Sequence, residues 1–211
     1  FGAEFGYGRF QDAERSMDHY HWENSASIES WYGKLTGHFG ESSAVSAFYL
    51  KNVQGLDGNS VDPDIKGAHV HAWGAGATID LGDSGLNIDG DFIQTRGNRD
   101  LGHANLWTAG LNYGKVDLNK PGSFTLGVHY VRADAGAYLL GNSALDMTDQ
   151  LEYGWDNGTG VKFWVAKAGV AVQKNVELDA YYNFGAKAFD RYDDSTKDPA
   201  NTWGVELNYA F

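Results

Sequence analysis

The chain has no cysteine, which excludes disulfide bridges and metal sites built from thiolates. It has only 3 prolines, and no segment approaches the roughly 18 consecutive apolar residues that a membrane-spanning helix requires. Basic residues are also scarce, because 16 Lys and Arg stand against 28 Asp and Glu and give a net charge of -12. This balance argues against a nucleic acid as partner.

What the chain does have is glycine, with 28 residues, and aromatic side chains, which make up 14% of it. The C-terminal segment shows how they are arranged: Trp203, Val205, Leu207, Tyr209 and Phe211 alternate with Thr202, Gly204, Glu206, Asn208 and Ala210. This period of two predicts an amphipathic β-strand. A last strand of this kind that ends on Phe resembles the closing strand of a bacterial outer-membrane β-barrel. The mean hydropathy of -0.44 does not contradict that interpretation, since half of each barrel strand faces water.

The same alternation recurs along the chain and predicts about ten strands. The segments are 1–9, 27–39, 44–52, 67–81, 86–96, 103–115, 123–130, 164–173, 176–184 and 201–211. Most are close to the 9 to 11 residues with which a tilted strand crosses a bilayer. We therefore expect an all-β fold, an antiparallel transmembrane β-barrel, with residues 1–211 as a single domain.

The expected connectors alternate in length. Short ones fall near 40–43, 82–85, 116–121 and 174–175, and long ones near 10–26, 53–66, 134–158 and 187–201, while 97–102 is short for its group. Short turns at one end and long loops at the other are typical of outer-membrane barrels, whose long loops are extracellular. This asymmetry places the C-terminus on the periplasmic side. The long loops are acidic, and such loops could bind divalent cations that bridge lipopolysaccharide.

Three stretches resemble one known family. They are Leu111 to Phe124, His129 to Ala137, and Val161 to Phe184, and they are similar to the porins of diderm Firmicutes. In those proteins a barrel follows an S-layer-homology domain, which is not found in this chain. The resemblance implies a homotrimeric diffusion channel for small hydrophilic solutes, set in outer-membrane lipid and lipopolysaccharide.

Barrel size decides whether such a channel is open. Eight strands leave an interior filled by side chains, whereas 16 to 18 leave an aqueous channel. Phe1 already lies within an alternating segment. We therefore expect this chain to be the C-terminal part of a larger barrel of about sixteen strands. The alternative is a complete, nearly closed ten-stranded barrel with a structural or adhesive role.

The polar phase of the strands supplies candidates for the pore lining. Its charged members are Lys34, Asp89, Asp91, Lys167, Glu177, Asp179 and Glu206. Acids outnumber bases five to two, which predicts a mild preference for cations. Tyr32 and Tyr181 belong to the same phase and could offer a stacking surface to a sugar. The alternative interpretation is that all of these are solvated wall residues paired across strands.

Enzymatic alternatives rest on short motifs. A protease similar to the omptins would need a His–Asp pair and a carboxylate pair at the rim, for which Asp18-His19 and Asp193-Asp194 are candidates. Gly82-Asp83-Ser84-Gly85 resembles the nucleophile motif of trypsin-like proteases, but it also suits a hairpin turn. His69-Val70-His71 lacks a third ligand at metal-site spacing. We therefore expect no catalytic residue, cofactor or metal.

Overall fold

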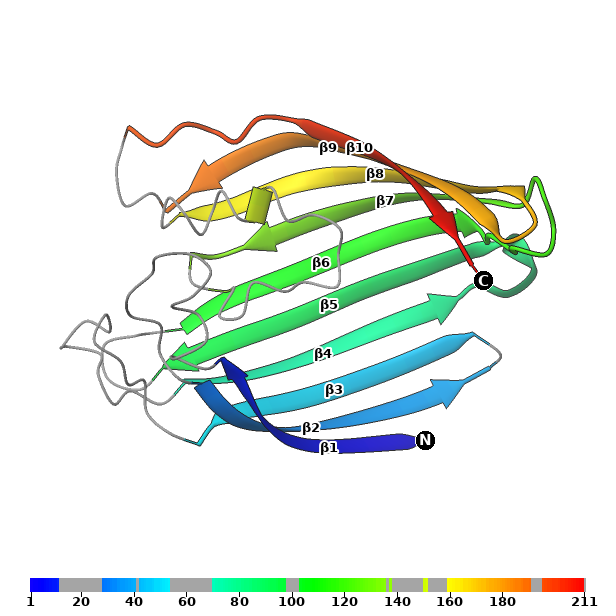
Figure 1. The fold of residues 1–211 in the computed structure, drawn as a ribbon. Helices are drawn as coiled ribbons and strands as arrows, with labels where there is room; N and C mark the ends of the chain where they lie inside the picture. Colours follow the sequence, from blue (N-terminus) through cyan, green and yellow to red (C-terminus); the bar gives the residue numbers. More distant parts are fainter. Residues whose placement is uncertain are drawn as a thin grey trace.

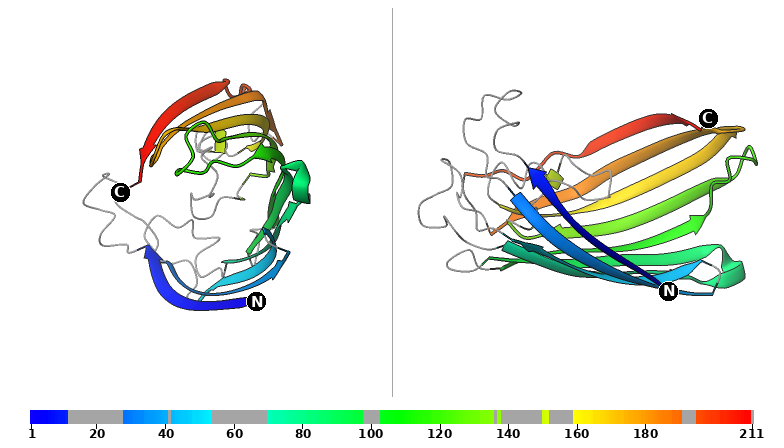
Figure 2. Two further views of the ribbon diagram at one scale, coloured as in Figure 1. Left: turned by 90° about the vertical axis from the view of Figure 1, so that its right-hand side faces the viewer. Right: turned by 60° about the horizontal axis from the view of Figure 1, so that its bottom comes forward.

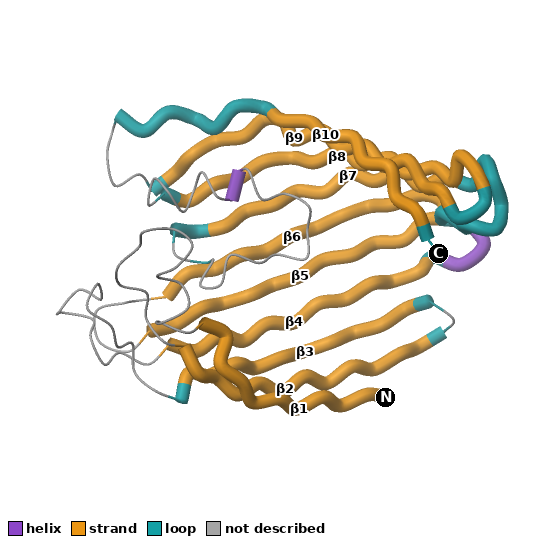
Figure 3. Tube along the Cα trace, in the orientation of Figure 1, coloured by secondary structure: helices purple, strands orange, loops and turns teal. Residues whose placement is uncertain are grey.

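The computed structural model describes residues 1–11, 28–40, 42–53, 70–97, 103–135, 137, 150–151, 159–190 and 195–210. Its strands are β1 (Gly2–Gln11), β2 (Ile28–Phe39), β3 (Ser43–Asn52), β4 (Val70–Asp80), β5 (Leu86–Gly97), β6 (His103–Gly114), β7 (Phe124–Ala133), β8 (Gly160–Gln173), β9 (Val176–Phe189) and β10 (Thr202–Tyr209). All ten form one antiparallel sheet whose strand order is the chain order (Figures 1 and 3). The predicted all-β fold and the number of strands are confirmed.

The sheet is strongly curved and remains open. Seen end-on in Figure 2, the strands curl round so that the two edge strands, β1 and β10, approach the same side. Within the described residues these two strands are not paired with each other. The structure therefore gives a curved meander of antiparallel strands and not a closed cylinder. No helix among the described residues is long and apolar enough to span a membrane.

Short and long connectors alternate as predicted. The connections β2–β3, β4–β5, β6–β7 and β8–β9 are short and lie at one end of the sheet, which we call the turn end. The other connections join the strands at the opposite end, the loop end. At the turn end, Gly82–Ser84 form a 3-10 turn, and Gly82 and Gly85 both have a φ of 69°. The left-handed region favours glycine, so the motif is a hairpin turn as the sequence indicates.

Two strands differ from their predicted bounds by four or more residues at one end. β8 begins at Gly160, although the alternation predicts its start at residue 164, and β9 continues to Phe189. The first residues of β8 include Val161 and Phe163, which point to the same face as the polar Lys167 further along the strand, so the period of two disappears. In β9, Gly185 has a φ of 64°, and the β8–β9 register shifts nearby, which interrupts the pattern.

A small apolar core lies at the loop end of β6 to β9. Its strand members are Ala104, Leu106, Val131, Ala133, Val161, Phe163, Val165 and Ala186. Ala137 and Leu151 pack against them, and both belong to the long β7–β8 connector. Val131, Val161 and Phe163 are fully buried. Ala137 and Leu151 therefore cover this part of the sheet.

Candidate functional site: the inner face of the sheet

The register divides the strand side chains between two faces. Cross-strand partners share a face, and successive partners form one row from β2 to β10: His38, Ala44, Thr78, Asp89, Gly110, His129, Val165, Asn183 and Thr202. Asn183 bonds to Gln150, which belongs to a helical turn inside the curve of the sheet (Figure 2). We therefore call the face of this row the inner face and the opposite one the outer face.

Every residue predicted to line a pore lies on the inner face: Tyr32, Lys34, Asp89, Asp91, Lys167, Glu177, Asp179, Tyr181 and Glu206. The acids occupy the half of the face near the turn end. The structure brings Asp179 and Glu206 together as cross-strand partners, and likewise Lys167 and Tyr181. It does not bring the two tyrosines together, because Tyr32 on β2 and Tyr181 on β9 are far apart in the strand order.

Asp89 on β5 belongs to a polar cluster that the sequence did not reveal. The Asn112 Nδ2 amide donates to Asp89 Oδ1 at 2.5 Å and to Asn87 Oδ1 at 2.9 Å. The His129 ring faces the same group, with Nε2 2.9 Å from Asn112 Oδ1 and Nδ1 3.4 Å from Asp89 Oδ2. Three strands thus contribute to a cluster in which one carboxylate is held by an amide and an imidazole. His129 and Asn112 are each isolated in the sequence, and only the register joins them.

The acids on β9 and β10 form a second group. Asp179 and Glu206 lie directly opposite each other, an arrangement that is unfavourable for like charges unless water or a cation screens them. Asn208 Nδ2 donates to Asp179 Oδ2 at 2.8 Å and satisfies one oxygen. Glu177 lies one inner-face position further toward the turn end. This group gives the inner face of β9 and β10 a negative local charge.

Glycines allow the large inner-face side chains to lie along the sheet. A Cβ atom at Gly110 would collide with the His129 ring, and one at Gly204 would collide with the Tyr181 ring. Each ring therefore covers the backbone of the neighbouring strand, which leaves more of the space inside the curve free. The tyrosine that was predicted to offer a stacking surface is thus held flat against the wall.

The β7–β8 connector is fastened to the inner face by a buried amide network. Asn183 Nδ2 donates to Gln150 Oε1 at 2.8 Å and to Thr202 Oγ1 at 3.0 Å. Gln150 Nε2 donates to Thr202 Oγ1 at 2.9 Å and to the Ala200 carbonyl at 3.1 Å. Both amide side chains are only 1% exposed. Since buried polar groups need partners, this network fixes where the connector crosses the inner face.

The outer face has the opposite character. Each strand exposes at least one large apolar side chain there: Phe5, Leu35, Val45, Trp73, Ile88, Trp107, Phe124, Trp164, Leu178 and Trp203. A series of aromatic residues, which we call the aromatic belt, crosses β2 to β9: Trp31, Tyr49, Trp73, Phe92, Trp107, Tyr130, Trp164 and Tyr182. Several neighbouring rings in it are in contact, for example Trp107 and Tyr130 with centroids 5.1 Å apart, and Tyr130 and Trp164 with centroids 4.9 Å apart. From the belt to the turn end, the described outward strand positions hold no charged side chain.

The remaining motifs contribute little to a site. The rim candidates Asp18-His19 and Asp193-Asp194 lie outside the described residues, as does His69. In the part of the chain that the structure describes, no three His, Asp or Glu side chains come close enough to hold a metal ion. Ser84 donates to the Leu81 carbonyl and accepts from the Leu86 amide, so its hydroxyl belongs to the hairpin turn.

The sequence matches no protein-family model and no curated protein.

Proposed function

We propose that this chain forms the wall of an outer-membrane porin, a water-filled barrel through which small polar solutes diffuse passively. The observation that carries the proposal is the division of side chains between the two faces of one sheet. All ten strands expose large apolar groups on the outer face, and the inner face holds the acids Asp89, Asp91, Asp179 and Glu206. Exposed apolar surface of this extent marks contact with a partner or a membrane. Lipid outside and water inside would solvate both faces.

A membrane setting requires that the sheet be closed. Backbone N–H and C=O groups on the free edges of β1 and β10 have no water to bond in hydrocarbon, so each edge needs a strand beside it. Additional strands that bring the total to about sixteen would close the ring around an aqueous channel. Direct pairing of β1 with β10 would instead give a narrow ten-stranded barrel. In Figure 2 the two edges face each other across a gap, which either way of closing the ring would fill.

Selection in such a channel would depend on charge and width. Inner-face acids near the turn end, with Lys34 and Lys167 as the opposing charges, attract cations and repel anions. Residues 150–151 of the β7–β8 connector, which are fastened to the wall through Gln150 and Asn183, would narrow the passage beside β9 and β10. Solutes would cross by diffusion, without a chemical step. Homotrimer formation is part of the proposal, and the mass of the protein in mild detergent tests it.

Single-channel recording tests the proposed function directly. The purified native protein is added to a planar bilayer, and the reversal potential is measured under a salt gradient. We expect steady conductance steps and a reversal potential directed toward cations. Folded protein that is inserted in the membrane but carries no current would contradict the porin proposal.

A second candidate is a structural barrel with an obstructed interior. The observation that favours it is the apolar core on the inner face, where Val131, Val161 and Phe163 are covered together with Leu151 of the connector. Packing of this kind fills space that an open channel would leave to water. The same recording separates the two candidates, because the obstructed barrel would carry no current.

A further inference from the structure

Basic side chains gather on the outer face at the loop end of the sheet. Lys51, His71, Arg96 and His103 are successive cross-strand partners on β3 to β6, and Arg132, Lys162 and Lys187 are successive partners on β7 to β9. We call these two rows the outer basic band. The band runs across seven adjacent strands in a chain whose net charge is -12.

This arrangement is electrostatically unfavourable by itself. Like charges placed directly opposite each other destabilise a sheet, and Arg132, Lys162 and Lys187 stand side by side. On the described strands, the only acid on the outer face is Glu29 of β2, which accepts a hydrogen bond from Tyr7 Oη at 2.9 Å. Among the described strand residues, no acid lies directly opposite the band, so its cations are available to bind an anion from outside the chain.

The band lies next to the aromatic belt, on its loop side. Lys51 is the next outward position after Tyr49, Arg132 the next after Tyr130, and Lys162 the next after Trp164. Aromatic rings of this kind sit at the level of lipid headgroups. Side chains one outward position further from the hydrocarbon therefore reach the level of the headgroup phosphates. At the turn end the outward strand positions are uncharged, so the band belongs to one leaflet only.

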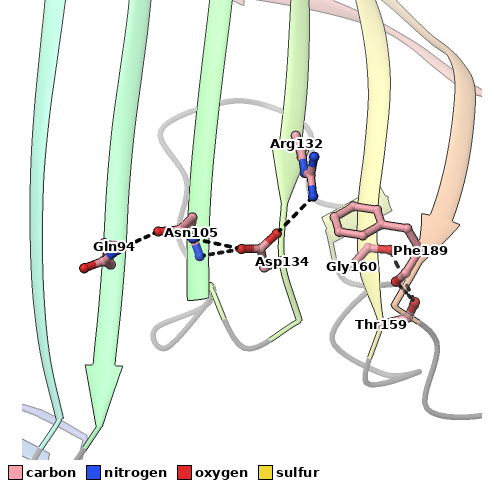
Figure 4. Close-up of polar contacts among 7 residues, drawn as sticks. All are labelled: Gln94, Asn105, Arg132, Asp134, Thr159, Gly160 and Phe189. Carbon is pink, nitrogen blue, oxygen red and sulfur yellow. Dashed lines mark hydrogen bonds and ion pairs between the residues drawn. The ribbon is translucent and has the colours of Figure 1, made fainter. Parts of the chain in front are cut away.

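A hollow of about 380 Å³ interrupts the belt beneath the band. Its walls are Phe92, Trp107, Asn105, Arg132 and Asp134. Figure 4 shows the chain of polar contacts along it: Gln94 Nε2 donates to Asn105 Oδ1 at 2.8 Å, and the Asn105 backbone and side-chain amides donate to Asp134 Oδ2 at 3.0 and 3.1 Å. The hollow thus joins an apolar floor to a polar edge, as the boundary between an acyl chain and a headgroup requires.

Arg132 is held above this hollow by two contacts. Its Nη2 atom lies 3.8 Å from Asp134 Oδ1, and its guanidinium carbon lies 4.5 Å from the centroid of the Phe189 ring (Figure 4). The side chain remains 44% exposed, so several of its five donors are open to an external acceptor. A planar guanidinium that is already positioned binds a phosphate in bidentate fashion at a smaller cost in entropy.

We propose that the outer basic band binds the phosphate groups of lipopolysaccharide in the outer leaflet. The inference rests on the proposed function, because it requires that the outer face lie in the outer membrane with the loop end outside the cell. Lipopolysaccharide fits the band better than a glycerophospholipid does. One lipopolysaccharide molecule carries several phosphates, which can contact cations on several neighbouring strands at once. The hollow beside Arg132 receives part of an acyl chain.

The test compares two variants of the same change in charge. In the band variant, Lys51→Gln, Lys162→Gln and Lys187→Gln remove three cations from the outer face; in the control variant, Lys115→Gln, Lys120→Gln and Lys174→Gln remove three at the turn end. Each full-length protein, immobilised in neutral detergent, is titrated with lipopolysaccharide, with its dephosphorylated form and with phosphatidylglycerol. We expect the band variant to bind lipopolysaccharide at least about tenfold more weakly, and the control variant to bind like the native protein.

Two further measurements distinguish a failure of the lipopolysaccharide proposal from a failure of the porin proposal. The native protein should lose affinity for lipopolysaccharide as salt is raised, which tests the band without any substitution. Single-channel conductance should be the same in native protein and band variant, so a failure of the porin proposal is seen independently of lipid binding. Undiminished binding by the band variant, equal loss in the control variant, or equal affinity for phosphatidylglycerol would overturn the inference.

Discussion

Two neighbouring residues of β9 illustrate how differently the faces of this sheet are built. Asp179 points to the inner face beside Glu206 and Asn208, whereas Leu178 points outward and is 36% exposed. The faces also differ in the sign of their charges. Among the described strand residues, acids other than Glu29 lie on the inner face, and the cations of the outer face form a band at one end. The two faces of the sheet are therefore suited to two different surroundings.

The inner face is not polar along its whole length. At the loop end of β6 to β8 the inner face is apolar and buried under the β7–β8 connector, while at the turn end it carries the acids. Packing of apolar side chains therefore stabilises one half of the inner face, and hydrogen bonds such as that of Asn112 with Asp89 join the polar side chains of the other. We expect substitutions in the two halves, and on the outer face, to differ in size in a definite order.

The largest effect should come from the buried core. Phe163→Ala removes a fully buried ring and should lower the free energy of unfolding by about 3–5 kcal/mol. Trp164→Ala, at the adjacent outer position, should lower the free energy of unfolding by clearly less, because lipid can fill the space that the ring leaves. Denaturant unfolding of the protein in lipid vesicles measures both. Equal losses would contradict the assignment of the two faces.

A charge on the outer face should have the next largest effect. Val45→Arg places a guanidinium at an outer position of β3 and should cost about 2–4 kcal/mol in lipid. Ser46→Arg, one residue later on the inner face, should lower the free energy of unfolding by less than about 1 kcal/mol. The same unfolding measurement compares them, and the reverse order would show that the outer face does not contact hydrocarbon.

The anchor of the connector should have an intermediate effect. Gln150→Ala leaves the buried amide of Asn183 without one acceptor and should cost about 1–3 kcal/mol. It should also release the connector, which increases hydrogen exchange in segment 150–151 and raises the conductance of the channel. Asn201→Ala serves as a control, because that side chain is exposed and bonds only to the Tyr182 hydroxyl. Unchanged exchange in the Gln150 variant would show that the network does not hold the connector.

The smallest effect concerns selectivity. Asp179→Asn combined with Glu206→Gln removes two neighbouring acids from the inner face and should shift the reversal potential toward zero. Lys162→Gln, on the outer face, should leave it unchanged. A shift of the same size in both variants would mean that these acids do not line the conducting path.

Much of the fold could be predicted from the sequence because alternation of polar and apolar residues is a local signal. The signal failed at Val161 and Phe163, because they are apolar on the inner phase, whereas from Trp164 onward the outer phase is apolar; the start of β8 was therefore placed four residues too late. It also failed beyond Gly185, where an irregular backbone changes the phase.

The site was predictable only in part for a related reason. The inner-face acids follow from the phase of each strand, but the contact of His129 with Asp89 depends on the register between strands. Gln150 could not be found, because nothing in its neighbourhood indicates that the connector folds back. The outer basic band was equally hidden, since it takes only one residue from each strand and the register alone aligns them.

The absence of cysteine from the chain makes one measurement especially direct. Single cysteines are introduced at residues 177 to 182 of β9, and each variant in lipid vesicles is treated with a water-soluble thiol reagent. The account predicts alternation: Glu177→Cys, Asp179→Cys and Tyr181→Cys react, while Leu178→Cys, Ala180→Cys and Tyr182→Cys are protected. Faster reaction at the outer positions would show that water covers the outer face, and it would contradict the assignment of lipid outside and water inside.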